Sequence, residues 1–145
     1  MNRTTRILGF GLAIAIVVAA ISEQSLNAQE KKKEVYVPPA QIKTILQRGL
    51  PTVEGKHITI FHATLPPNFV GGKHYHTGPV YVYVLEGVFT IDEPGKARQT
   101  FKAGDLYEEP LGTPMQAFNM NTSEPTMILV IQVNRPDEPL MYKAD

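Results

Sequence analysis

The chain has no cysteine among its 145 residues. Disulfide bonds, thiolate metal ligands, a cysteine nucleophile and a lipid-modified N-terminal cysteine are therefore excluded. This absence does not locate the protein, because a cysteine-free chain suits reducing and oxidising compartments equally.

Excess charge of either sign is also missing. The formal net charge is zero, and only 19% of the residues are charged. Without a basic face, we expect no nucleic-acid partner. Three enzyme signatures are absent too, namely a phosphate-cradling glycine loop, a serine nucleophile elbow and a zinc-protease helix.

The first 28 residues have the pattern of a secretory signal peptide. Arg3 and Arg6 precede an uncharged apolar run at 7–21, and the chain becomes polar before the small residue Ala28. The run is shorter than the roughly 20 residues that a membrane-spanning helix needs. We expect cleavage to release a periplasmic or secreted protein without a membrane partner. An uncleaved N-terminal anchor is the alternative.

The mature chain is predicted to form one small all-β domain. Short stretches rich in β-branched and aromatic residues alternate with Gly, Pro and Asp turns, as in β-sandwiches and barrels. We predict a signal peptide at 1–28, a linker and extension at 29–54, a barrel at 55–135 and a C-terminal tail at 136–145.

One short helix is predicted in the extension. Ile42, Ile45 and Leu46 have helical spacing, and they lie between two prolines and Gly49.

The stretch "GGKHYHTGPVYVYVLEG" holds two of the four histidines in the chain. Side chains two apart on a strand point to the same face, so His74 and His76 are expected to converge. Two neutral imidazoles can bind one metal ion, although a useful site needs further ligands from another strand.

This stretch and "GDLYEEPLGTPMQAFN" resemble the two motifs of the cupin superfamily. The resemblance covers about residues 55–135 and implies a double-stranded β-helix or jelly-roll barrel of the kind found in small single-domain bacterial cupins. It also implies a homodimer. The positions in register are His74, His76 and Gly87 in the first motif, and Gly104, Pro110, Gly112 and Asn119 in the second.

The chain departs from those motifs at two metal-ligand positions. The family's glutamate falls at Val80, and the histidine of the second motif falls at Met115. The resemblance therefore implies only half of the usual ligand set, namely His74 and His76.

The first of three hypotheses is a non-standard metal site. Met115 or His62 would join the two histidines around a single divalent or copper ion, and a thioether suits copper(I). Met115 fits ordinary core packing equally well. His62 lines the barrel only if the face that it shares with Ile58 and Ile60 points inward.

In the second hypothesis, a carboxylate from elsewhere in the chain substitutes for the missing ligands. Glu108 and Glu109 are adjacent, so at most one of them points inward. An inward glutamate in an apolar barrel has a raised pKa unless it is paired, and it can act as an acid or a base.

In the third hypothesis the barrel is a metal-free binding pocket. Tyr107 and Phe118 are candidate ligand contacts. If Val80 points inward, the adjacent Tyr81 points outward, towards a partner sheet or subunit.

The leading hypothesis is an exported protein that binds a small molecule in a pocket centred on His74 and His76, with or without a metal ion. Glu109, Tyr107 and Phe118 would contact the ligand. A metal-dependent oxygenase or isomerase is one alternative, and a non-catalytic structural or interaction module with a decayed site is another. The residues do not decide whether the protein is an enzyme.

Overall fold

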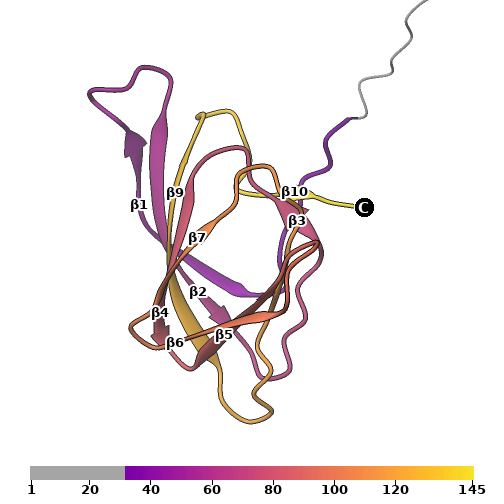
Figure 1. Ribbon diagram of the computed structural model, residues 1–145. Helices are drawn as coiled ribbons and strands as arrows, with labels where there is room; N and C mark the ends of the chain where they lie inside the picture. The colour runs from indigo at the N-terminus through magenta and orange to yellow at the C-terminus, as the bar shows by residue number, and fades with distance from the viewer. Residues whose placement is uncertain (1–31) are drawn as a thin grey trace, which may run out of the picture. The chain divides into compact units, whose positions relative to one another are not determined.

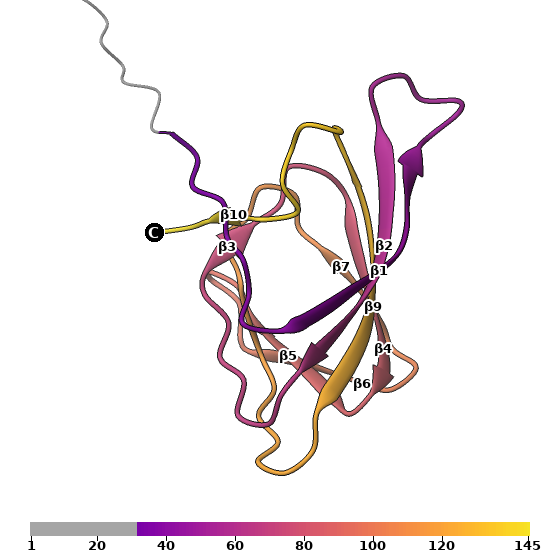
Figure 2. The same ribbon diagram turned by 180° about the vertical axis from the view of Figure 1, so that it is seen from behind.

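The computed structural model describes residues 32–145. Three antiparallel sheets build the domain (Figures 1 and 2). The predicted signal peptide lies outside the described residues. The strands are β1 (Gln41–Gly49), β2 (His57–Leu65), β3 (His74–Tyr75), β4 (Val80–Glu86), β5 (Val88–Asp92), β6 (Gln99–Lys102), β7 (Leu106–Glu109), β8 (Gln116–Phe118), β9 (Thr126–Asn134) and β10 (Tyr142–Lys143).

The two larger sheets lie on opposite sides of a central space. One has the strand order β1-β2-β9-β4-β7, and the other has the order β6-β5-β8. The short pair β10-β3 continues the side formed by the smaller sheet, as Figure 2 shows. The prediction of an all-β barrel is confirmed.

The predicted helix is wrong, because residues 41–49 form strand β1. This strand pairs along its length with β2, whose backbone groups would otherwise be unpaired at that edge. A bulge between Thr44 and Leu46 shifts the alternation of side chains. Ile42 therefore lies opposite Ala63 on the inner face, whereas Leu46 lies opposite Ile60 on the outer face. The helix-like spacing of these apolar residues suits a bulged strand as well as a helix.

Strict alternation places the core between the sheets. Val80, Val82 and Val84 are at most 1% exposed, while Tyr83 on the other face of β4 is 38% exposed. The predicted inward and outward sides of this strand are therefore confirmed. Full burial of one aliphatic or aromatic side chain stabilises the folded state by roughly 1.5–3 kcal/mol. The largest fully buried apolar side chains are Phe61, Phe89, Ile91, Met115, Val80, Val82 and Val84.

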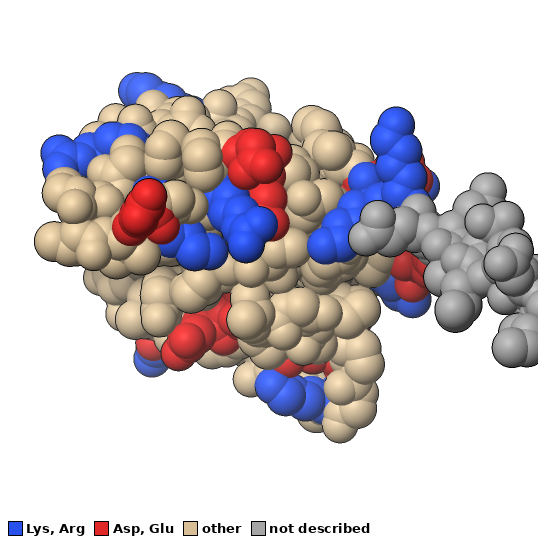
Figure 3. Space-filling model, turned by 90° about the horizontal axis from the view of Figure 1, so that it is seen from above, with Lys and Arg blue, Asp and Glu red and all other residues tan. Residues whose placement is uncertain are grey.

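Charges are dispersed over the face seen in Figure 3. Figure 3 shows basic and acidic side chains interspersed on a mostly uncharged face. Within residues 32–145, no helix has the length and apolar character to cross a bilayer.

Candidate functional site

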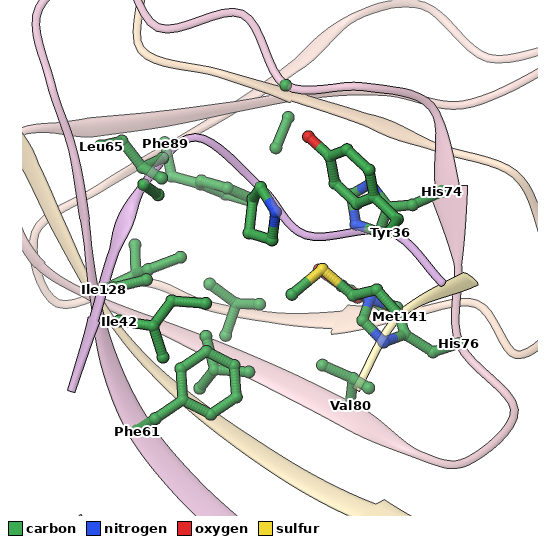
Figure 4. Close-up of a pocket in the computed structure, with 18 of the residues that line it drawn as sticks. Tyr36, Ile42, Phe61, Leu65, His74, His76, Val80, Phe89, Ile128 and Met141 are labelled. Carbon is green, nitrogen blue, oxygen red and sulfur yellow. The ribbon is translucent and has the colours of Figure 1, made fainter. Parts of the chain in front are cut away.

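An apolar pocket lies between the sheets, and a few polar side chains are at one end of it (Figure 4). The cavity has a volume of about 60 Å³. This is room for about four to six water-sized groups. The polar lining residues are Tyr36, His74, His76 and Glu109. The apolar ones include Ile42, Phe61, Ala63, Leu65, Val80, Val82, Phe89, Ala117, Ile128, Val130 and Met141.

Strand β3 and the turn after it deliver both histidines to this pocket. His74 and His76 are buried, whereas Tyr75 between them stacks on Tyr142 on the other side. Gly78 makes the tight return to β4 possible, because a Cβ there would lie 1.8 Å from the carbonyl oxygen of Val133. The structure therefore places both imidazoles on one side of the chain, as the spacing predicts.

The outer nitrogen of each imidazole is held by the backbone. Nδ1 of His74 lies 3.0 Å from the carbonyl oxygen of Gly72, and Nδ1 of His76 lies 2.7 Å from that of Leu140. Because a carbonyl oxygen only accepts hydrogen bonds, each Nδ1 carries a proton. Burial, as the largest effect, and the neighbouring His76 lower the pKa of His74 against the opposing effects of Gly72 and Glu109.

Glu109 is the third member of the polar end. Along β7 the exposed Leu106 and Glu108 alternate with the buried Tyr107 and Glu109, so only Glu109 of the two glutamates reaches the pocket. It lies directly opposite Val80 in the β4–β7 ladder. The carboxylate therefore enters the barrel from the strand beside the one on which the cupin motif carries its glutamate.

His76 and Glu109 form a buried pair. Their Nε2 and Oε2 atoms are 2.8 Å apart, and both side chains are at most 7% exposed. Apart from this contact, the buried Oε2 has no hydrogen-bond partner among the described residues. A buried acceptor without a partner costs about 1–3 kcal/mol. This cost is recovered if a ligand supplies a donor.

Two residues outside the predicted barrel complete the pocket wall. Tyr36 stacks on His74, with 5.1 Å between the ring centroids, and its hydroxyl accepts a hydrogen bond from the Gly72 N–H. Met141 lies across from it, and the Tyr36 N–H donates to the Met141 carbonyl. Sequence reasoning missed both residues, because "EVYVPP" and "DEPLMYKAD" show no periodic pattern that would assign them to the barrel.

His62 and Met115 are not part of the pocket wall. The buried face of β2 carries Phe61, Ala63 and Leu65, so His62 lies on the outer face of the sheet. The condition for a ligand role of His62, that its face lines the barrel, is not met, because the odd-numbered residues of β2 are the buried ones. Met115 pairs with His74 through two backbone hydrogen bonds, and its side chain belongs to the hydrophobic core.

Tyr107 and Phe118 also lie away from the pocket. The Tyr107 hydroxyl donates a hydrogen bond of 2.7 Å to Glu93 Oε1, and its ring packs against Phe101. Arg98 stacks over the ring of Phe118, 4.6 Å from its centroid. Neither aromatic ring is therefore positioned to contact a ligand in the pocket.

A metal centre does not fit the residues as they are arranged. Within residues 32–145, no group of three or more His, Asp or Glu side chains is positioned to hold an ion. His76 Nε2, the nitrogen that would ligate, faces Glu109 instead. The geometry instead pairs a buried imidazole with a buried carboxylate, a combination that also occurs in general acid–base sites.

Comparisons with known proteins agree with this architecture. A family model described as "Cupin domain" matches residues 61–132. The search of curated proteins finds no match.

Similar solved structures share the fold at low sequence identity. The polyketide cyclase RemF from Streptomyces resistomycificus has 20% identity and a TM-score of 0.58, with 81% of this chain and 82% of that chain covered. The DMSP lyase DddQ from Ruegeria pomeroyi has 17% identity and a TM-score of 0.56. That match covers 79% of this chain but only 53% of the lyase. A cupin-like protein from Thermotoga maritima has 15% identity and a TM-score of 0.55, over 72% of this chain and 85% of that one.

Proposed function

Because this chain carries a small cupin-type domain, we propose that it binds a small molecule in the pocket that His74, His76 and Glu109 close at one end. The observation that carries the proposal is the group of buried polar side chains, His74, His76 and Glu109, at one end of an apolar cavity. Ligand sites have this composition, with mostly apolar walls and a few polar groups that orient the ligand. The similar solved structures include a DMSP lyase and a polyketide cyclase, which supports the proposal at the level of the fold.

The test is a small-molecule binding screen on the mature chain, residues 29–145. Ala117 is a pocket wall residue, so Ala117→Phe fills the cavity. Ala97→Phe makes the same chemical change at an exposed position in the loop between β5 and β6 and serves as the control. We expect the parent chain and the control to bind the same compounds and the filled variant to bind none of them. Equal binding by all three proteins would place the ligand elsewhere and overturn the proposal.

Export is part of the proposal. The basic start, the apolar run and the small residue at 28 support a cleaved signal peptide. N-terminal sequencing of protein from the periplasmic fraction and the medium tests this, and we expect a new N-terminus near residue 29. A full-length chain that stays with the membrane would indicate an uncleaved anchor.

We also propose that two copies pair through the outer face of the five-stranded sheet. Leu46, Ile60, Ile131 and Tyr81 are successive partners across four strands and form one apolar row. In the next row, Tyr83 pairs with Leu106, whose side chain is 60% exposed. An apolar stripe of this kind favours an isologous contact between two copies.

A further inference from the structure

One stretch of extended chain separates the pocket from solvent on one side. Tyr36, Pro38 and Ala40 are half-buried and line the pocket, whereas the residues between them, Val37 and Pro39, are exposed. A single layer of chain therefore has the cavity on one face and water on the other. Figure 2 shows this stretch passing from the β10–β3 pair to the start of β1. Residues 34–40 are called the strap below.

The walls that the sheets provide are held far more firmly than the strap. Phe61 and Ala63, for example, belong to β2, which is paired along its length with β1 and β9. Moving such a wall breaks many backbone hydrogen bonds together, so it requires nearly global unfolding. The strap has only an isolated bridge, between Val35 and Tyr142. The strap is therefore the part of the wall that can move at the lowest cost.

Tyr36 is the main attachment of the strap. Its ring stacks on His74, its hydroxyl accepts a hydrogen bond from the Gly72 N–H, and its own N–H donates to the Met141 carbonyl. Gly72 leaves space for the ring, because a Cβ at this position would lie 2.6 Å from Cε2 of Tyr36. The ring therefore fits its place only while residue 72 has no side chain.

The rest of the strap is weakly attached. The Glu34 carbonyl accepts a hydrogen bond from the Lys143 N–H, and the two side chains form an exposed ion pair, which contributes little. Val37 is 78% exposed. Pro38 and Pro39 have no N–H with which to bond to the barrel. Release of Tyr36 would thus free most of the strap.

We infer that the strap is a movable cover of the pocket, which Tyr36 holds closed and which lifts away from the barrel to admit the ligand. The closed cavity of about 60 Å³ has room for only a few water-sized groups. Lifting the strap removes three lining residues and gives a larger organic molecule access to the walls that remain (Figure 4). The role of this opening rests on the proposed function, but the opening itself can be measured without a ligand.

The absence of native cysteine allows a thiol to report the opening. Ala63→Cys places the only thiol of the chain in the pocket wall, at a position that is 5% exposed. Its reaction with dithiodipyridine, a neutral thiol reagent, is timed in the mature chain at low urea concentrations. Local opening exposes little surface, so we expect the rate to change little with urea, whereas reaction through global unfolding rises steeply. Ala97→Cys, at an exposed position, is the reference for a free thiol.

Two substitutions in the Ala63→Cys protein test the attachment from both sides. Tyr36→Ala removes the ring and its hydroxyl, and Gly72→Ala displaces the ring without changing the strap. We expect each to raise the urea-insensitive rate about tenfold. Together they should exceed Tyr36→Ala alone by nothing, because the added methyl group then has no ring to displace. Val37→Ala changes an exposed residue of the same strap and should leave the rate unchanged.

Three results would overturn the inference. If the Ala63→Cys thiol reacts as fast as that of Ala97→Cys, the pocket is open without any movement. If its rate rises with urea as steeply as global unfolding, with or without Tyr36→Ala, the strap does not open locally. Equal rates in Tyr36→Ala and Val37→Ala would show that Tyr36 does not hold the strap. No ligand enters these measurements, so the proposed function and the movable strap can fail independently.

Discussion

Val80 of β4 lies directly opposite Glu109 of β7 in an antiparallel ladder. The cupin motif carries its glutamate at the position of Val80, so the carboxylate of this chain enters the barrel from one strand away. At that position it meets His76 Nε2 at 2.8 Å. The imidazole is thereby directed at a carboxylate of the same chain.

This relationship predicts how a metal site can be introduced. The double variant Val80→Glu, Met115→His gives the chain the full set of ligands in the cupin motifs, beside His74 and His76. Val80 is 0% exposed, so the new carboxylate would be buried without a partner and should destabilise the metal-free variant by several kcal/mol. We expect added zinc or manganese to raise its unfolding temperature by many degrees, as differential scanning calorimetry would show.

The parent chain is the control for this variant, and we expect its unfolding temperature to change little with the same ions. An equal rise for both proteins would show that the two substituted positions do not limit metal binding.

Tyr107 is predicted to matter for stability and not for binding. Its hydroxyl donates to Glu93, a buried carboxylate that also accepts hydrogen bonds from Lys96 and Gln99. Loss of this bond in Tyr107→Phe should lower the free energy of unfolding by about 1–2 kcal/mol. Urea unfolding measures this change. Affinity for the compounds found in the binding screen should stay the same, and a tenfold loss of affinity would show that Tyr107 does reach the ligand.

The lowered pKa of His74 predicts a pH-dependent loss of stability. Burial is its main cause, and the ordinary value is 6.5. As pH falls through about 6.5, His74 of the unfolded chain takes up a proton, while the folded chain resists protonation until lower pH. The unfolded state then binds more protons, so stability decreases as pH falls.

Urea unfolding at pH 7.5 and pH 5.5, on the parent chain and on His74→Gln, measures this effect. The parent chain should lose more stability over this interval than the variant. Equal losses in the two proteins would mean that His74 does not contribute to the pH dependence.

The outer face of the large sheet predicts the oligomeric state. Ile131 lies in the middle of the apolar row between Ile60 and Tyr81. Ile131→Lys should therefore convert a dimer into a monomer, as light scattering after size-exclusion chromatography would show. Leu111→Lys introduces the same charge at a position that is 64% exposed and outside the sheets, and this variant should stay dimeric. A monomeric parent chain would contradict the proposal.

The fold was predictable because short stretches of the sequence show both the strands, with their alternating side chains, and the turn residues between them. The inward direction of Val80 and the outward direction of Tyr81 also follow from period two alone. The strand β1 was missed because its bulge imitates helical spacing. The face of His62 depends on pairing with β9, which no local pattern encodes.

The pocket was predictable only in part. Spacing predicts that His74 and His76 share a side, and adjacency predicts that only one of Glu108 and Glu109 points inward. Which of the two does so depends on the β4–β7 register. Tyr36 and Met141 reach the site through pairing of segments that are distant in sequence, such as the bridge between Val35 and Tyr142. Sequence alone does not specify such contacts.

The most direct test of the account is elemental analysis of the mature chain after incubation with iron, manganese, zinc and copper and removal of the excess. The variant His74→Ala, His76→Ala is measured beside it. If His76 is paired with Glu109 and the pocket is free for an organic ligand, the bound metal will be far below one ion per chain and equal in both proteins. One ion per chain in the parent and none in the variant would contradict the account and establish a metal centre at these histidines.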